Sequence, residues 1–143
     1  MPYRFLEDIA TADVAFEAWG ATREELFAAA ATALLATMVH EPGLIERRQE
    51  LSVRLEHAEL DLLLYSFLAE LVFLKDARRL LLHADILKID GGEGDFRLVA
   101  LLRGEEIAPS RHRLQVDVKA VTLHRLRVAC VDGVWRATVV LDI

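Results

Sequence analysis

Residues 51–74 read LSVRLEHAELDLLLYSFLAELVFL, and this stretch decides the fold class. Its first part, 51–57, alternates apolar and polar side chains, which predicts a strand with one buried face. Its second part, 59–74, carries large apolar side chains at three- and four-residue spacing, which predicts a helix. The apolar band of this helix is broad, so we expect it to be buried on more than one side.

A second strand and helix precede this stretch. Residues 14–19 alternate in polarity and predict a strand that follows another strand at the N-terminus. Thr22 and Glu25 stand three residues apart in the arrangement of a capping box, in which the hydroxyl accepts an early helical N–H and the carboxylate reaches back. The helix that they begin is predicted to end near Val39 and to bury one apolar stripe.

The rest of the chain is predicted to form strands. Asp132-Gly133 predicts a tight hairpin turn, since such turns need positive φ at both central residues. The predicted fold class is therefore α+β, with two helices packed on a largely antiparallel multi-stranded sheet in a single domain, 1–143. The strands expected in this half are 80–89, 96–103, 114–120, 124–131 and 135–143.

The composition excludes several classes of protein. Of the 143 residues, 17 are Lys or Arg and 23 are Asp or Glu, a net charge of −6, so sequence-specific nucleic-acid binding is not expected. The single cysteine, Cys130, rules out an internal disulfide framework and fits a reducing compartment. Carboxylates occupy the place of a signal peptide's apolar region, and no apolar run is long enough to span a bilayer. We expect a cytoplasmic protein without membrane association.

The common catalytic motifs are missing from the sequence. It contains no G-x-x-x-x-G-K-[ST], G-x-G-x-x-G, H-E-x-x-H or G-x-S-x-G pattern, and its five histidines lack the spacing of metal ligands. The sequence therefore does not predict an enzyme.

Oxygen ligands for a hard cation are the remaining candidates for a site. Asp8 and Asp13 flank a mostly apolar segment near the N-terminus, and Asp142 stands beside the carboxylate of Ile143. Divalent cations such as calcium bind several oxygens at once. Spacing alone does not bring Asp13 to Asp142, so simple solvated acids remain the alternative. Lys119 is a lone cation among apolar residues, either facing outward from a sheet or supporting an anionic site.

Several stretches, in order along nearly the whole chain, resemble the archease family. They are TADV at 11–14, FLAEL at 67–71, VDVKAVTLH at 116–124, GVW at 133–135 and LDI at 141–143. The resemblance implies an activator protein of the GTP-dependent tRNA-splicing RNA ligase, which joins RNA 3′-phosphate ends to 5′-hydroxyls. An archease promotes guanylylation of that ligase and its multiple turnover.

The resemblance also assigns roles to particular residues. It implies that Asp13, Asp142 and Ile143 hold a divalent cation, with calcium the usual ion, and that Lys119 and His124 belong to the region that activates the ligase. The acidic balance of the chain agrees with a basic, RNA-binding partner.

The sequence departs from the family pattern at five positions. Ile9 stands where the family usually has histidine, and the other departures are Phe67 for Trp, Ala69 for Asn, Asp117 for Glu and Leu123 for Tyr. None of these departures removes Asp13 or Asp142, the carboxylates that the resemblance assigns to the metal.

Two other classes of function stay open at this point. A chaperone-like interaction module is the main alternative, because the apolar surplus favours an exposed sticky patch. A metal-dependent hydrolase that uses the two aspartates is weaker, because no convincing second base accompanies them.

Overall fold

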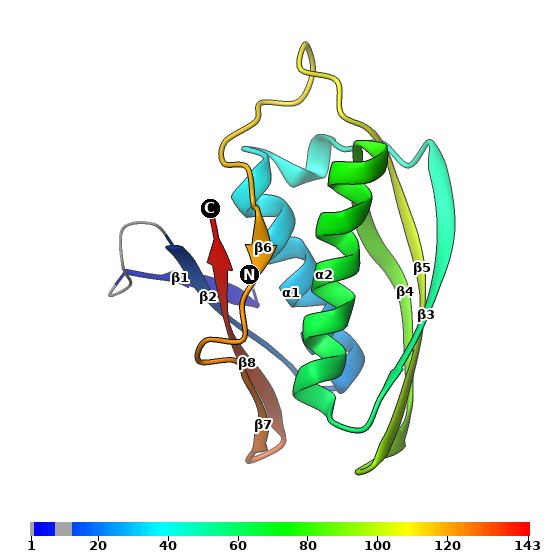
Figure 1. The fold of residues 1–143 in the computed structure, drawn as a ribbon, viewed down its shortest axis with the longest axis vertical. Helices are drawn as coiled ribbons and strands as arrows, with labels where there is room; N and C mark the ends of the chain where they lie inside the picture. The colour runs from blue at the N-terminus through cyan, green and yellow to red at the C-terminus, as the bar shows by residue number, and fades with distance from the viewer. Residues whose placement is uncertain (1, 8–12) are drawn as a thin grey trace.

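The computed structural model describes residues 2–7 and 13–143, which form two antiparallel sheets with two α-helices between them (Figure 1). This arrangement confirms the predicted α+β fold class. Its antiparallel strands divide into two sheets, one on each side of the helices. The helices are α1 (Arg23–Met38) and α2 (Leu60–Arg78), with a short 3-10 turn at Pro42–Leu44; the strands are β1 (Tyr3–Leu6), β2 (Asp13–Gly20), β3 (Gln49–His57), β4 (Leu80–Gly92), β5 (Asp95–Glu106), β6 (Ala120–Val121), β7 (Arg127–Val131) and β8 (Val134–Asp142).

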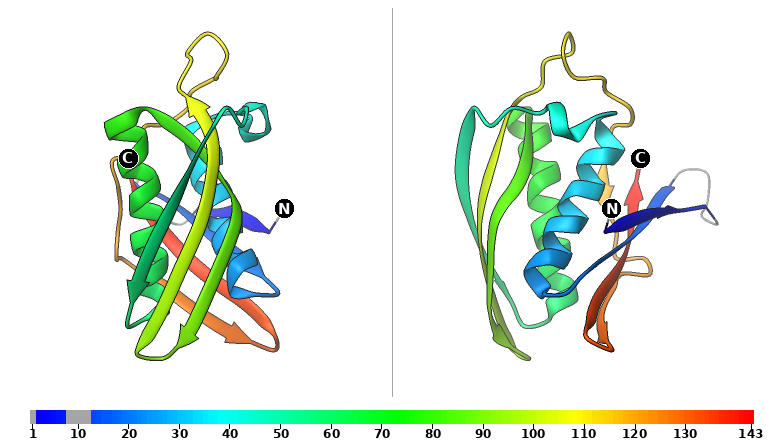
Figure 2. Two further views of the ribbon diagram at one scale, coloured as in Figure 1. Left: turned by 90° about the vertical axis from the view of Figure 1, so that its right-hand side faces the viewer. Right: turned by 180° about the vertical axis from the view of Figure 1, so that it is seen from behind.

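The helices are buried because they form the middle layer (Figure 2). α1 packs on β2 and on β4, which belong to opposite sheets, and α2 packs on β3, β4 and β6. Ten of the 16 residues of α1 are buried, and they cover most of its circumference; the side left partly open carries Glu25, Ala28, Thr32 and Ala36. The expectation of a single stripe on α1 was too narrow. The broad band predicted for α2 agrees with its position between the sheets.

The predicted capping box at the start of α1 is confirmed. The Thr22 hydroxyl accepts a hydrogen bond from the Glu25 N–H at 3.1 Å, and the Glu25 carboxylate accepts one from the Ala21 N–H at 2.7 Å. These two bonds satisfy amides that have no partner inside the helix.

The larger sheet has the order β1-β2-β8-β6, and β7 also pairs with β8. Because β2 occupies one side of β8, β6 and β7 lie along its other side as one edge strand interrupted at 122–126. Arg125, inside the interruption, has a φ of 56°. The predicted hairpin turn at Asp132-Gly133 is confirmed, since both residues have positive φ (53° and 77°).

The strand predicted at 114–120 was wrong except for its last residue. Residues 114–119 cross the C-terminal end of α1 and use their polar groups there. The Gln115 N–H donates to the Met38 carbonyl at 2.9 Å, and its side-chain amide donates to the Ala36 carbonyl at 2.8 Å. The last carbonyls of a helix lack partners within it, so this segment serves as a cap.

The smaller sheet has the order β3-β5-β4. Its inner face joins the core with side chains such as Val53, Leu98 and Ala100. Phe27 of α1 and Phe67 of α2 stack at the centre of the molecule with ring centroids 6.0 Å apart. No helix in the described part of the chain is both long and apolar enough to cross a bilayer.

Candidate functional site

Asp13 and Asp142 lie directly opposite each other at the end of the β2–β8 ladder. Opposed residues in an antiparallel pair point to the same face with Cβ atoms about 4.5–5.5 Å apart. Side chains alternate between the two faces of a strand. The residues that face the other way on β2 and β8, such as Phe16, Val139 and Leu141, are in the core, so Asp13 and Asp142 point to the outer face of the sheet. The topology thus brings together two carboxylates that are far apart in the sequence.

The chain around Asp142 is held on both sides. The Asp142 carbonyl accepts a hydrogen bond from the Lys119 N–H at 2.8 Å, and Ala120 of β6 pairs with Asp142 across from Asp13. Ile143 follows β8 directly and is half-buried against the core. The backbone that leads to Ile143 is therefore fixed by the end of β8.

No three side chains of His, Cys, Asp or Glu gather in a metal-binding group within residues 2–7 and 13–143. A cation near Asp13 and Asp142 would need further oxygens, such as those of Ile143. Asp8, the other candidate from the sequence, lies outside the described residues.

Lys119 lies beside a shallow cavity on the outer side of α2. β6 lies beside α2 (Figure 1), and residues of both elements line this cavity of about 260 Å³. Phe73, which is 58% exposed, and Asp76 contribute to it from α2. A cation, a carboxylate and an exposed aromatic ring on one surface can contact a protein partner through both charge and apolar area.

His124 lies at the other end of β6, in the interruption between β6 and β7. Its backbone N–H donates to the Thr122 hydroxyl at 3.2 Å, and its side chain is exposed. Leu123 beside it is 58% exposed. Lys119 and His124 therefore flank a two-residue strand, and both are open to solvent.

Lys75 fixes the segment that leads to Lys119, and sequence reasoning missed it. Its buried ammonium, 6% exposed, donates to the Val118 carbonyl at 2.8 Å and contacts Asp117 at 2.6 Å and Asp76 at 2.8 Å. Burial lowers the pKa of Lys75, but the hydrogen bonds to Asp117 and Asp76 outweigh it, so that the pKa lies above its ordinary value. The signal in the sequence was a lysine at a position where the apolar band of the helix should continue.

A second buried polar cluster holds the loop that precedes this segment. The Glu105 carboxylate accepts hydrogen bonds from the Glu46 N–H at 2.6 Å, from Arg111 and from the His112 ring at 3.1 Å. Burial raises the pKa of Glu105, but these donors outweigh it and hold the pKa below its usual value. The His112 ring accepts at its Nδ1 from the Ala108 N–H at 2.8 Å, so its Nε2 carries the hydrogen that faces Glu105.

The chain matches known proteins along nearly its whole length. Residues 3–143 match the model of the archease protein family. The chain belongs to the archease family. It is 37% identical to protein archease of Pyrococcus furiosus over 134 residues, covering 93% of this chain and 94% of that one. It is 36% identical to protein archease of Archaeoglobus fulgidus, with both chains fully covered.

Solved structures of archeases share this fold. The solution structure of Methanobacterium thermoautotrophicum protein 1598 superposes with a TM-score of 0.85 at 34% identity, covering 99% of both chains. A crystal structure from Thermotoga maritima, described as an archease and possible chaperone, superposes with a TM-score of 0.64 at 21% identity, covering 98% of both chains. The resemblance seen in the sequence motifs is thereby confirmed.

Four of the five residues that depart from the archease pattern lie within the described part of the chain, and the structure shows their surroundings. Phe67 is fully buried and stacks on Phe27, so it serves the core, whereas Ala69 contributes to the cavity beside Lys119. Asp117 keeps a carboxylate in contact with Lys75, and Leu123 is exposed. Ile9 lies outside the described residues.

Proposed function

We propose that this archease activates the GTP-dependent tRNA-splicing RNA ligase, promoting its guanylylation and multiple turnover without itself catalysing a reaction. Membership of the archease family carries this proposal. The family resemblance supplies the ligase as the partner, and the exposed surface around Lys119, Phe73 and His124 is suited to contact a protein. The net charge of −6 favours encounter with a basic, RNA-binding protein.

A divalent-cation site at Asp13, Asp142 and Ile143 belongs to the same proposal. Like charges placed directly opposite each other in a sheet destabilise it unless a counter-charge is present. Carboxylate oxygens are ligands that calcium prefers, so the donor set fits this ion. When bound, the ion supplies positive charge, and the three residues tie the start of β2 to the end of β8.

Ligase guanylylation with and without this chain tests the activator proposal directly. Substoichiometric amounts should accelerate guanylylation of the cognate ligase, and Lys119→Ala or His124→Ala should weaken the acceleration while the melting temperature is unchanged. Lys88→Ala, at an exposed lysine on β4, is the matched control and should activate as the wild type does. Unchanged guanylylation in the presence of the wild type would refute the proposal.

Thermal unfolding with calcium tests the cation site separately. A ligand at 100 times its Kd adds about 2.7 kcal/mol to the stability of the folded state, or about 5–10 °C for a chain of this size. Asp13→Asn should raise the calcium-free melting temperature, because it removes a like charge, and should abolish the calcium response. Asp90→Asn, at an exposed carboxylate of β4, should keep the response.

The terminal carboxylate has its own test. Residues added after Ile143 convert that carboxylate into an amide, so we expect a C-terminal tag to lower calcium affinity and ligase activation. An N-terminal tag should do neither. Equal calcium shifts for both tagged proteins would remove Ile143 from the proposed ligands.

A chaperone-like interaction module is the second candidate function. Phe73 and Leu123, each 58% exposed, are the apolar side chains that favour it. Suppression of the aggregation of unrelated client proteins, lost in a Phe73→Ser, Leu123→Ser variant, would support this function. A chain that activates the ligase and leaves such clients to aggregate is an activator only.

A further inference from the structure

The two edge strands of the smaller sheet, β3 and β4, differ in whether side chains bond their outward backbone groups. At the β4 edge, the Arg23 guanidinium donates to the Gly91 and Ile89 carbonyls at 3.0 and 3.1 Å, and the Glu24 carboxylate accepts from the Ile89 N–H at 3.1 Å. The first turn of α1 thus occupies backbone groups that would otherwise pair with another strand. No side chain or backbone group in the described ranges, 2–7 and 13–143, bonds the outer edge of β3 in this way. An open edge of nine residues is a template for another strand.

Successive residues of β3 point their backbone N–H and C=O groups to alternate sides of the strand, so only every second residue can bond a further strand. The backbone groups of Ile89 and the Gly91 carbonyl point away from β5 toward α1, so the even-numbered residues of β4 beside them bond the odd-numbered residues of β5. The even-numbered residues of β5 therefore point toward β3, as the Gly104 carbonyl does when it accepts from the Arg48 N–H at 2.9 Å, and their partners in β3 are odd-numbered. Since the direction of these groups alternates along a strand, the even-numbered residues of β3 point theirs away from the sheet.

The outer face of β3 carries charges in a self-complementary order. Glu50, Ser52 and Arg54 follow one another on this face, with Ser52 at the centre and Glu56 next along the strand. If a second copy pairs antiparallel with Ser52 opposite Ser52, each Glu50 faces an Arg54. The even-numbered residues then form the hydrogen-bonded pairs, in which opposed residues exchange both backbone bonds and their side chains lie on the same face.

Neighbouring registers are disfavoured by the same charges. Centring the pair on Val53 places Glu50 opposite Glu56, and centring it on Leu51 places Glu50 opposite Ser52, which removes both Glu50–Arg54 pairs. Registers in which an even-numbered residue faces an odd-numbered one would place the charged face of one copy beside the core face of the other. The register centred on Ser52 is therefore selected by attraction within it and by repulsion or loss of that attraction in its neighbours.

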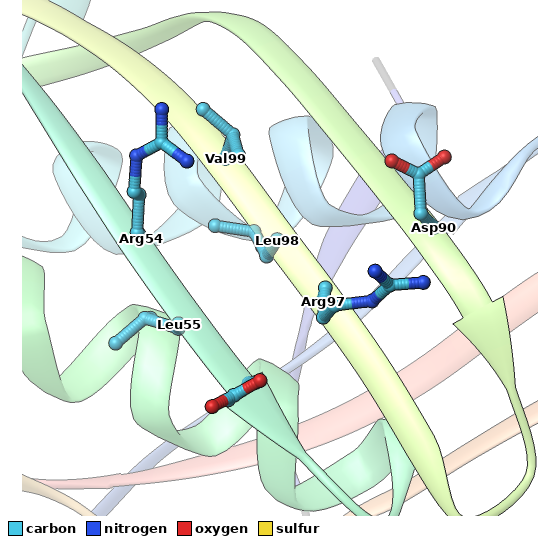
Figure 3. A pocket seen from close by; sticks show the side chains of 7 residues that line it. Arg54, Leu55, Asp90, Arg97, Leu98 and Val99 are labelled. Carbon is cyan, nitrogen blue, oxygen red and sulfur yellow. The ribbon is translucent and has the colours of Figure 1, made fainter.

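These side chains are available for pairing. Figure 2 shows β3 at one edge of the sheet, and Figure 3 shows Arg54 on β3 near Val99 and Leu98 of β5. Arg54 and Glu56 are exposed and make no ion pair with any other described residue. Glu50 contacts Arg103 at 3.2 Å at the surface, a contact that leaves its carboxylate 63% exposed.

We propose that two copies of this chain associate through β3, antiparallel and with Ser52 on the two-fold axis, so that their smaller sheets join into one continuous sheet. The contact is isologous and closes as a dimer. One strand edge buries little area, which places the dimer among weak, concentration-dependent assemblies.

Sedimentation equilibrium on charge-reversed variants tests the contact. The wild type should form a dimer as its concentration rises from about 1 µM to about 1 mM, the range of weak association. Glu50→Arg and Arg54→Glu each create two like-charge contacts and should weaken self-association at least about tenfold. An equimolar mixture of the two variants restores both pairs and should associate as well as the wild type. Lys88→Glu, on the closed β4 edge, is the control and should dimerise normally.

Disulfide trapping tests the register. In a Cys130→Ser background, Ser52→Cys places two thiols opposite each other on the axis and should give a covalent dimer under mild oxidation. Glu56→Cys, equally exposed, does not face its own counterpart and should stay largely monomeric. A wild type that remains monomeric throughout, a dimer indifferent to both charge reversals, or efficient trapping at position 56 in place of position 52 would overturn the proposal.

Discussion

Replacing Lys75 by methionine should destabilise the protein and loosen the segment that carries Lys119. The change leaves the buried Val118 carbonyl without its donor, which costs about 1–3 kcal/mol. The carboxylates of Asp76 and Asp117 are 56% and 77% exposed, so each lost ion pair adds only about 0–1 kcal/mol. Methionine keeps most of the apolar stem in place. We expect the free energy of unfolding to fall by about 2 kcal/mol.

Urea unfolding followed by fluorescence of the two half-buried tryptophans, Trp19 and Trp135, measures this change. With a slope of about 2 kcal/mol per molar urea, the midpoint should fall by about 1 M at an unchanged slope. Lys88→Met, the same substitution at a lysine whose side chain is 72% exposed, is the control and should leave the midpoint within about 0.25 M. A Lys75→Met midpoint equal to that of the control would refute the argument that the buried ammonium anchors residues 117–118.

Three further perturbations have direct readouts. Gly104→Ala places a Cβ 1.8 Å from the Leu81 carbonyl oxygen, so the free energy of unfolding should fall by at least about 3 kcal/mol. The melting temperature should drop accordingly, or the variant should fail to express. The pKa of Glu105 is lower in the folded state than in the unfolded state, so the ionised carboxylate stabilises the fold above about pH 4.3, and this stabilisation is lost as the pH falls through the folded-state pKa. The Glu105→Gln variant should therefore be less stable than the wild type at pH 7 and should lose less stability on acidification. Thr22→Ala removes the cap of α1 and should cost about 1 kcal/mol in the same urea assay, whereas Thr22→Ser should cost little.

Local features of the fold could be predicted from the sequence because their causes are local. The capping box of Thr22 and Glu25 and the turn at Asp132-Gly133 involve residues within a few positions of one another. The division into two sheets could not be predicted in this way, since it depends on which strands pair across the helices. The segment 114–119 alternates like a strand, but its polar groups serve the end of α1 instead.

The candidate site also depends on contacts between residues that are far apart in the sequence, which the sequence alone does not reveal. The residues Asp13 and Asp142 could be chosen as oxygen ligands from their chemistry, but their approach depends on β2 and β8 pairing over the whole length of β2. Lys75 was not chosen, although a lysine interrupting an apolar band was visible. A buried charge is recognisable only once its acceptors, here Val118 and Asp117, are known to lie beside it.

The position of β8 in the larger sheet has a consequence for synthesis of the chain. β8 emerges from the ribosome after all the other described strands, yet it lies between β2 and the β6–β7 edge and covers part of α1. The smaller sheet and both helices are complete in sequence by Glu106, so they can assemble while translation continues. Until residues 134–142 emerge, the apolar side of α1 that β8 will cover lies open. A nascent chain stalled before β8 should therefore aggregate or recruit a holdase, and the emergence of β8 should end that exposure in one step.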